Sequence, residues 1–279
     1  PMGCVRLFVN GVPRVGSKYG TRDDYEDWQP RFDFVELPVE LKPGENRFLL
    51  RCARGRAKLS LFTPPEPVYF NLKDATLPDI VRNMPGKLHA AAVVVNTTEK
   101  LVRGGVITAS GKGLKTVTAP AGIIQPRSAR KVGFLLEPED SLPRQDALAV
   151  QLTFSNKYHT FRATVPVSIK NHSENHKRTF ISNIDNSVQY YAVNPARSNN
   201  IKKPGLVLSV HGAGVEAVNQ AGAYSSKTWA HIVAPTNRRP YGYDWEDWGR
   251  IDALEVLADA RQHLSIDEER IYLTGHSMG

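Results

Sequence analysis

The five residues from Gly275 to Gly279, Gly-His-Ser-Met-Gly, place a serine between two glycines. A serine hydroxyl can attack an ester or amide carbonyl once a neighbouring base takes its proton. An exposed nucleophile of this kind sits on a sharp turn that follows a strand. A side chain two residues before or after the serine would collide with that turn, and Gly275 and Gly279 have none. The pattern therefore predicts that Ser277 is a nucleophile.

A second motif could serve the same chemistry. His211 to Gly214, His-Gly-Ala-Gly, comes directly after an apolar run that is typical of a buried strand. Acyl transfer develops an oxyanion, and each fixed N–H donor stabilises it by about 2.7–4 kcal/mol. Gly212 and Gly214 allow the backbone of this loop to approach a substrate closely. We expect the His211 side chain to be architectural, and His276, next to the serine, to be a packing residue.

The elements that must position these motifs alternate between strand and helix. Apolar runs at 204–210, 229–236 and 270–274 are typical of strands buried on both faces. Residues 250–264 have a helical period. The apolar stripe of this helix is expected to comprise Ile251, Leu254, Leu257, Ala258 and Leu264. Such alternation predicts a parallel sheet with crossover helices.

Together, the phrases VHGAG, HIVAPTNR, DWGRIDALEVL and IDEERIYLTGHSMG resemble the first half of an α/β-hydrolase catalytic domain. The closest group is that of prolyl-oligopeptidase-like and polyhydroxyalkanoate-depolymerase-like esterases and peptidases. The resemblance covers residues 178–279. It implies a serine hydrolase that cleaves an ester, polyester or peptide bond through an acyl-enzyme on Ser277, with no cofactor and no metal. It also implies that the backbone N–H groups of Met278 and Ala213 form the oxyanion hole, with Gly214 as the alternative to Ala213.

One departure from that family limits the expected activity. In the family the triad acid and the histidine come after the serine, and no residue follows Gly279 here. We therefore expect a fragment that is inactive by itself, the full-length protein being the enzyme. Asp252 and Asp259, which lie upstream of the serine, are interpreted as helix-surface residues.

The first two thirds of the chain are rich in short strand patterns. Residues 1–65 contain the phrases VNG and LKPGEN, and they resemble the later strands of a galactose-binding-like jelly roll, so we expect further strands ahead of Pro1. Residues 66–170 show regularly spaced strands and turns, typical of an immunoglobulin-like sandwich. The predicted fold class is therefore multidomain: a jelly-roll-like and an immunoglobulin-like part, then the first half of an α/β-hydrolase parallel sheet over 171–279.

A different function is also consistent with the β-rich part. The polar segment 20–30 carries Tyr25 and Trp28 among acidic residues, as sugar-binding loops do, although a plain surface loop fits it as well. The alternative function is therefore a carbohydrate- or surface-binding protein whose hydrolase part is degenerate. Modular β-domains ahead of a hydrolase also favour export, to the periplasm or the cell exterior.

The composition limits the kinds of partner and site that the chain is expected to have. The net charge is +8, divided as +3, +6 and −1 over residues 1–65, 66–170 and 171–279. The basic residues are scattered singly, whereas a nucleic-acid binder concentrates them on one element, so no nucleic acid is expected. No apolar stretch approaches the roughly 18 residues of a membrane span. The two cysteines, Cys4 and Cys52, could form one disulfide or remain free thiols, and they are too few for a zinc site.

Overall fold

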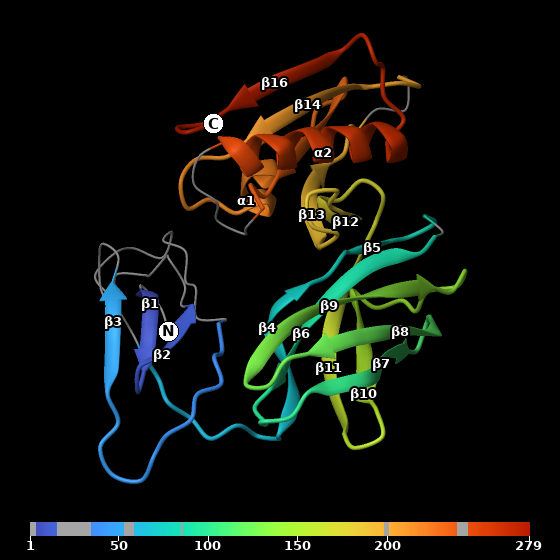
Figure 1. The fold of residues 1–279 in the computed structure, drawn as a ribbon. Helices are drawn as coiled ribbons and strands as arrows, with labels where there is room; N and C mark the ends of the chain where they lie inside the picture. The colour runs from blue at the N-terminus through green and yellow to red at the C-terminus, as the bar shows by residue number, and fades with distance from the viewer. Residues whose placement is uncertain (1–3, 16–34, 53–58, 85, 198–200, 239–244) are drawn as a thin grey trace.

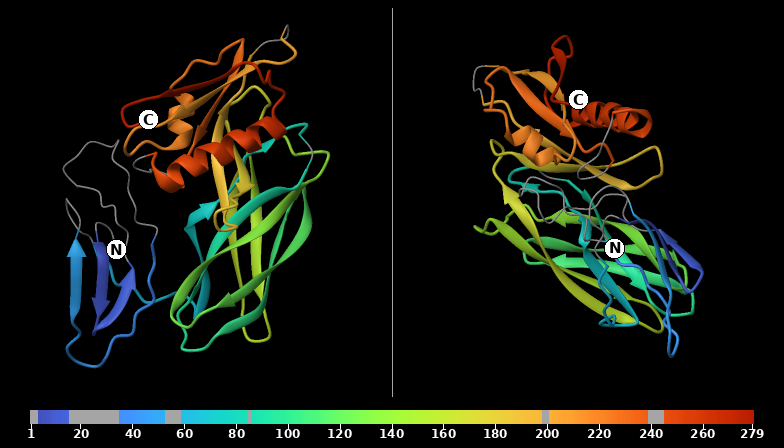
Figure 2. Two further views of the ribbon diagram at one scale, coloured as in Figure 1. Left: turned by 45° about the horizontal axis from the view of Figure 1, so that its top comes forward. Right: turned by 90° about the vertical axis from the view of Figure 1, so that its left-hand side faces the viewer.

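The computed structural model describes residues 4–15, 35–52, 59–84, 86–197, 201–238 and 245–279. Over these residues the chain forms sixteen strands and two helices in three sheets (Figure 1). The third sheet lies over one end of the second, and the small first sheet stands beside the second (Figure 2). No helix of this described part is long and apolar enough to cross a membrane.

The first sheet is small and has the strand order β2-β1-β3. Its strands are β1 (Cys4–Val9), β2 (Val12–Val15) and β3 (Phe48–Cys52). The β1–β2 hairpin turns at Asn10 and Gly11, whose φ angles of 50° and 82° are those that an Asn-Gly hairpin turn favours. The antiparallel register places Cys4 opposite Cys52, while both cysteine side chains lie outside the described part, so their pairing stays open.

The second sheet has eight strands in the order β4-β6-β9-β8-β7-β10-β11-β5. Alternate residues of β10 point into one shared apolar core, where the Phe154 ring stacks on Phe161 with centroids 4.7 Å apart. This alternation follows from the two-residue period of a strand with one buried face. The strands are β4 (Val68–Thr76), β5 (Ile80–Val81), β6 (Leu88–Asn96), β7 (Val102–Gly111), β8 (Leu114–Ile124), β9 (Ser128–Pro138), β10 (Ala147–Ser155) and β11 (Thr160–Lys170).

The third sheet has five strands in the order β12-β13-β15-β14-β16. They are β12 (His176–Ile181), β13 (Val188–Asn194), β14 (Gly205–Val210), β15 (Ala230–Pro235) and β16 (Ile271–Gly275). β14 pairs in parallel with β15 and β16, whereas β13 pairs antiparallel with β12 and β15. β16 is an edge strand, and its Tyr272 and Leu273 side chains are 47% and 73% exposed.

Two helices pack on this sheet. α1 (Ala217–Gly222) contacts Ala192 and Ala234, whereas α2 (Asp247–His263) contacts the neighbouring Val193 and Val233. Because successive strand residues point to opposite faces, α1 and α2 cover opposite faces of the third sheet. The side chains that α2 buries are those of Asp252, Ala253, Val256 and Ala260, together with Gly249.

The predicted apolar stripe of this helix is therefore displaced. Of the residues predicted for this stripe, Leu254 is 52% exposed, and only Leu257 and Leu264 pack partly against the core. Small residues let the α2 backbone lie close to the sheet. Both stripes fit the 3.6-residue period, so periodicity alone cannot distinguish them.

The predicted fold class is wrong. The described chain is nearly all β, with two helices and three sheets, in place of two β-modules followed by half of an α/β-hydrolase parallel sheet. The third sheet is also mixed, because β13 pairs antiparallel with β12 and β15. The apolar runs of strands buried on both faces look alike in parallel and mixed sheets, and the sequence pattern therefore did not reveal this pairing.

The division into domains at residues 65 and 170 remains a prediction. Contacts do cross the second of these boundaries. The backbone N–H of Lys177 donates to Asp79 Oδ2 at 2.7 Å, and Thr179 Oγ1 donates to the carbonyl of His89 at 2.6 Å. These bonds join β12 of the third sheet to β6 of the second sheet and to the residue that precedes β5.

Candidate nucleophile site

Ser277 lies on a tight turn immediately after β16. Its φ angle is +60°, in the left-handed region that a residue with a side chain seldom adopts. Its side chain is exposed. Residues held in such a conformation carry backbone strain and are concentrated at functional sites.

The two glycines of the motif have no room for a side chain. A Cβ on Gly275 would lie 2.2 Å from the carbonyl carbon of Gly279, and a Cβ on Gly279 would lie 2.3 Å from the carbonyl oxygen of Val210. Both distances are far below a van der Waals contact, and the neighbouring atoms are backbone. The turn that carries Ser277 therefore requires glycine at both positions.

The His-Gly loop lies against this turn. Val210, the last residue of β14, pairs with Gly275, the last residue of β16, and the two parallel strands end at the same edge. The N–H of His276 donates to the Val210 carbonyl at 3.2 Å. A Cβ on Gly212 would lie 3.0 Å from the Cβ of Ser277. The two motifs, more than sixty residues apart in the sequence, thus form one local site.

The loop closes in a second tight turn. The N–H of Val215 donates to the Gly212 carbonyl at 3.2 Å, and Gly214 has a φ of +72°. The N–H groups of Ala213, Gly214 and Met278 donate to no acceptor in the described part of the chain. These three N–H groups thus have no described acceptor, and their assignment to an oxyanion hole remains a proposal.

His211 is fully buried at the base of the loop. Its Nδ1 lies 2.8 Å from the Gly212 carbonyl oxygen. Because a carbonyl can only accept, Nδ1 carries the proton, and the buried Nε2 finds no partner among the described residues. No described histidine ring is hydrogen-bonded to Ser277. His276, expected to be a packing residue, is exposed.

Two side chains missed by the sequence analysis fix the end of β14. Trp245 Nε1–H donates to the carbonyl of His211 at 2.9 Å, and its ring meets the His211 ring edge to face with centroids 4.9 Å apart. From the α1 side, Gln220 Nε2 donates to Ser209 Oγ at 2.8 Å. The run Asp-Trp-Glu-Asp-Trp, residues 244–248, was the available signal, since aromatic side chains ahead of a helix often pack inward.

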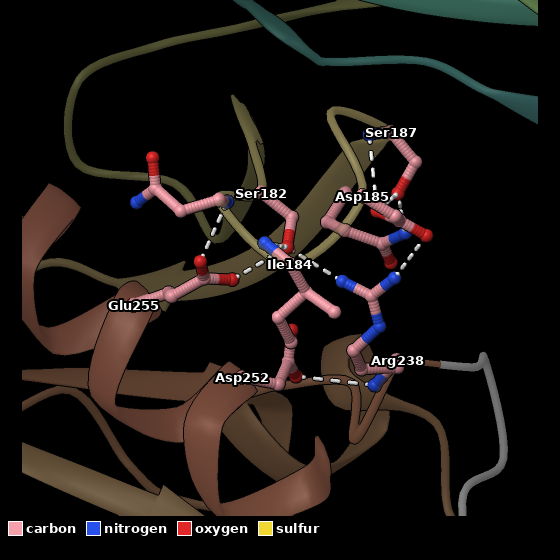
Figure 3. Close-up of polar contacts among 9 residues, drawn as sticks. Ser182, Ile184, Asp185, Ser187, Arg238, Asp252 and Glu255 are labelled. Carbon is pink, nitrogen blue, oxygen red and sulfur yellow. Dashed lines mark hydrogen bonds and ion pairs between the residues drawn. The ribbon is translucent and has the colours of Figure 1, made fainter.

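A polar network ties the loop after β15 to α2 and to the β12–β13 turn (Figure 3). The Arg238 guanidinium donates to Ser182 Oγ at 2.6 Å and to Asp185 Oδ2 at 2.5 Å. Ser182 Oγ in turn donates to Glu255 Oε2 on α2 at 2.7 Å. Arg238 itself has a φ of +61°, so its strained backbone is held by these contacts.

Asp252 was predicted to be a helix-surface residue, and this prediction is wrong. Its side chain has no exposed surface, and its Oδ2 accepts the backbone N–H of Arg238 at 3.2 Å. Burial raises the pKa of this carboxyl to about 6, although the backbone N–H groups of Arg238 and Asn237 oppose the shift. Asp259 is also engaged, since it accepts a 2.8 Å hydrogen bond from the Tyr191 hydroxyl. Tyr25 and Trp28, of the expected sugar-binding loop, lie outside the described residues.

Comparisons with known proteins show only distant likeness. No family model matches the chain, and no curated protein matches it. Among solved structures, a thermostable esterase is 18% identical over 75% of this chain and 72% of its own, with a TM-score of 0.31. A GH20 exo-β-N-acetylglucosaminidase from Vibrio harveyi, in complex with N-acetylglucosamine, is 11% identical over 47% of this chain and 25% of its own, with a TM-score of 0.17. At these TM-scores neither likeness carries an argument about function.

Proposed function

We propose that this chain carries the nucleophile and the oxyanion-binding loop of a serine hydrolase that acts on an ester or peptide bond. The observation that supports this most is the conformation of Ser277. A non-glycine residue at φ +60° is exposed on a turn after a strand, between two glycines at which an added Cβ would clash with backbone atoms. Backbone strain at an exposed serine favours a functional role over an ordinary turn.

The proposed chemistry is acyl transfer. Ser277 Oγ attacks the substrate carbonyl carbon, and the carbonyl oxygen becomes an oxyanion that the N–H groups of Met278 and Ala213 stabilise, Gly214 being the alternative donor. The intermediate collapses when the alcohol or amine leaves with a proton, which gives the acyl-enzyme. Water then attacks the acyl carbon, the acid departs, and Ser277 is regenerated.

A general base must take the serine proton for this cycle to turn over. No described histidine ring is hydrogen-bonded to Ser277, so none of these rings is placed to take its proton directly. We therefore infer that the chain alone hydrolyses esters very slowly. The oxyanion donors act without the base, and donors together with binding leave a residual acceleration of about 10³–10⁴ over water when a triad member is missing.

Active-site phosphonylation tests the proposal. The chain is incubated with a fluorophosphonate probe, and the modified residue is located by mass spectrometry of its peptides. We expect slow modification confined to Ser277, and its loss in Ser277→Ala. The matched control is Ser265→Ala, which removes an exposed serine from the same part of the chain and should leave the labelling unchanged. Labelling spread over many serines, or undiminished in Ser277→Ala, would show that Ser277 is an inert residue on a strained turn.

A further inference from the structure

Two tryptophans flank the start of α2 and make opposite contacts. Trp245 is partly buried, packs against the core of the third sheet and donates to the carbonyl of His211. Trp248 is 60% exposed, and its ring lies 5.5 Å from the guanidinium carbon of Arg238. Only Trp245 therefore reaches the loop that faces Ser277.

The carbonyl that Trp245 binds belongs to the peptide unit that leads into Gly212. That peptide plane is fixed by the indole hydrogen bond on the His211 oxygen, and the His211 ring is fixed by its own bond to the Gly212 carbonyl. Since a peptide unit is planar, a rotation that frees the His211 oxygen also turns the N–H of Gly212 and moves the turn that follows. Gly212 has no side chain to resist such a rotation.

The next peptide units carry the N–H groups of Ala213 and Gly214, which donate to no described acceptor. The loop hydrogen bond from Val215 to Gly212, at 3.2 Å, is long for an N–H to oxygen bond and gives little restraint. The Trp245 indole is therefore the main side-chain restraint on the start of this loop from the α2 side.

We propose that Trp245 is a positioning residue that holds the His211–Gly212 peptide, and with it the unengaged N–H groups of the loop, in place beside Ser277. This inference rests on the proposed function for its catalytic consequence, but its structural part can be tested independently. Trp245 acts through the loop and touches no reacting atom.

The structural part is tested by amide hydrogen exchange of Trp245→Phe. Phenylalanine retains an aromatic ring and removes the indole donor. We expect exchange of peptides covering residues 211–216 to rise by about five- to tenfold, the factor that one neutral hydrogen bond is worth. Trp248→Phe is the matched control and should leave exchange there unchanged. Unchanged exchange at 211–216 in Trp245→Phe overturns the inference.

The catalytic part is tested by separating the two constants of phosphonylation, the probe concentration at half-saturation and the limiting rate. Trp245→Phe should lower the limiting rate by about tenfold, since part of one oxyanion interaction is lost, and leave the half-saturating concentration unchanged. If Trp245 only stabilises the fold, Trp245→Phe should lower the urea midpoint and leave the limiting rate and the half-saturating concentration of the folded protein unchanged. That result would contradict a positioning role.

The two proposals fail in different ways. If the unmodified chain is not labelled at Ser277, the proposed function fails, and the exchange experiment still decides whether Trp245 holds the loop. If Trp245→Phe does not fold, indole proton exchange in the unmodified chain replaces it. The Trp245 indole proton should then exchange more slowly than that of the exposed Trp248, and equal rates overturn the inference.

Discussion

Gly212 faces the Cβ of Ser277 so closely that a methyl group on Gly212 would lie 3.0 Å from it. The same methyl group would lie 3.2 Å from the carbonyl oxygen of His276. The two proposed halves of the site therefore lie close together, with no room for a side chain on Gly212 unless a neighbour shifts.

Gly212→Ala should push these halves apart. Overpacking of this kind destabilises a protein by about 1–3 kcal/mol, and we expect a loss at the low end because Ser277 is exposed and can shift. Urea unfolding gives the loss, and phosphonylation of Ser277 should slow. Gly222→Ala is the control, since the nearest atom to its new Cβ is 3.7 Å away. A Gly212→Ala chain with unchanged stability and labelling would contradict the close packing.

Ser277→Gly should stabilise the fold while it abolishes labelling. Glycine adopts φ +60° without the penalty of about 1–2 kcal/mol that a side chain meets in the left-handed region. Ser277→Ala removes the same hydroxyl and retains the penalty, so its stability should remain near that of the unmodified chain. Equal urea midpoints for the two variants would mean that the turn is not strained.

Asp252 should make stability fall as the pH rises. Its folded pKa of about 6 lies above the ordinary value of 3.8, so the folded state binds the proton more tightly than the unfolded state. The resulting stabilisation is complete below about pH 4 and is lost as the pH rises through about 6, with a total of about 2–3 kcal/mol at 1.36 kcal/mol per pKa unit.

Asp252→Asn cannot titrate, so relative to the unmodified chain it should gain stability between about pH 4 and pH 7. The measurement is urea unfolding across that range. Asp140→Asn, at an exposed position, is the control and should follow the unmodified chain. If the difference between Asp252→Asn and the unmodified chain does not change with pH, the carboxyl does not titrate in this range.

Arg238 and Asp185 should couple more strongly than a surface ion pair. The Arg238 side chain is only 9% exposed and lies 2.5 Å from Asp185. A double-mutant cycle with Arg238→Gln and Asp185→Asn should give about 1–3 kcal/mol, the upper part of the range for residues in one network. The reference pair is Arg261 and Glu268, which are 2.7 Å apart and about half exposed, and should give under about 1 kcal/mol. Equal coupling in the two cycles would show that the network adds nothing.

The sequence pattern predicted the local elements of the third sheet better than their pairing. The runs at 204–210, 229–236 and 270–274 correspond to β14, β15 and β16, and the helical period at 250–264 corresponds to α2. The mixed pairing was missed because an apolar run does not reveal the direction of its neighbour. Strand direction depends on the connections between elements and on long-range packing.

The site was predictable only in part, for a similar reason. Gly275, Gly279 and Ser277 lie close together in the sequence, and their turn follows from local steric restrictions. Trp245 and Arg238 act on partners far away in the chain, His211 and Ser182, and no local pattern indicates such contacts. Asp252 was misjudged because a carboxylate on a helix is usually solvated, whereas this one accepts backbone N–H groups from the preceding loop.

The exposed edge of β16 affects how the protein should be handled in solution. Its outer backbone groups are unpaired within the described sheet, and the adjacent Tyr272 and Leu273 present apolar surface on opposite faces of the strand. Such an edge is a template on which another chain can add a strand. Self-association should therefore grow with protein concentration. The reactivity of Ser277 should be measured in dilute samples whose particle size shows that the chain is monomeric.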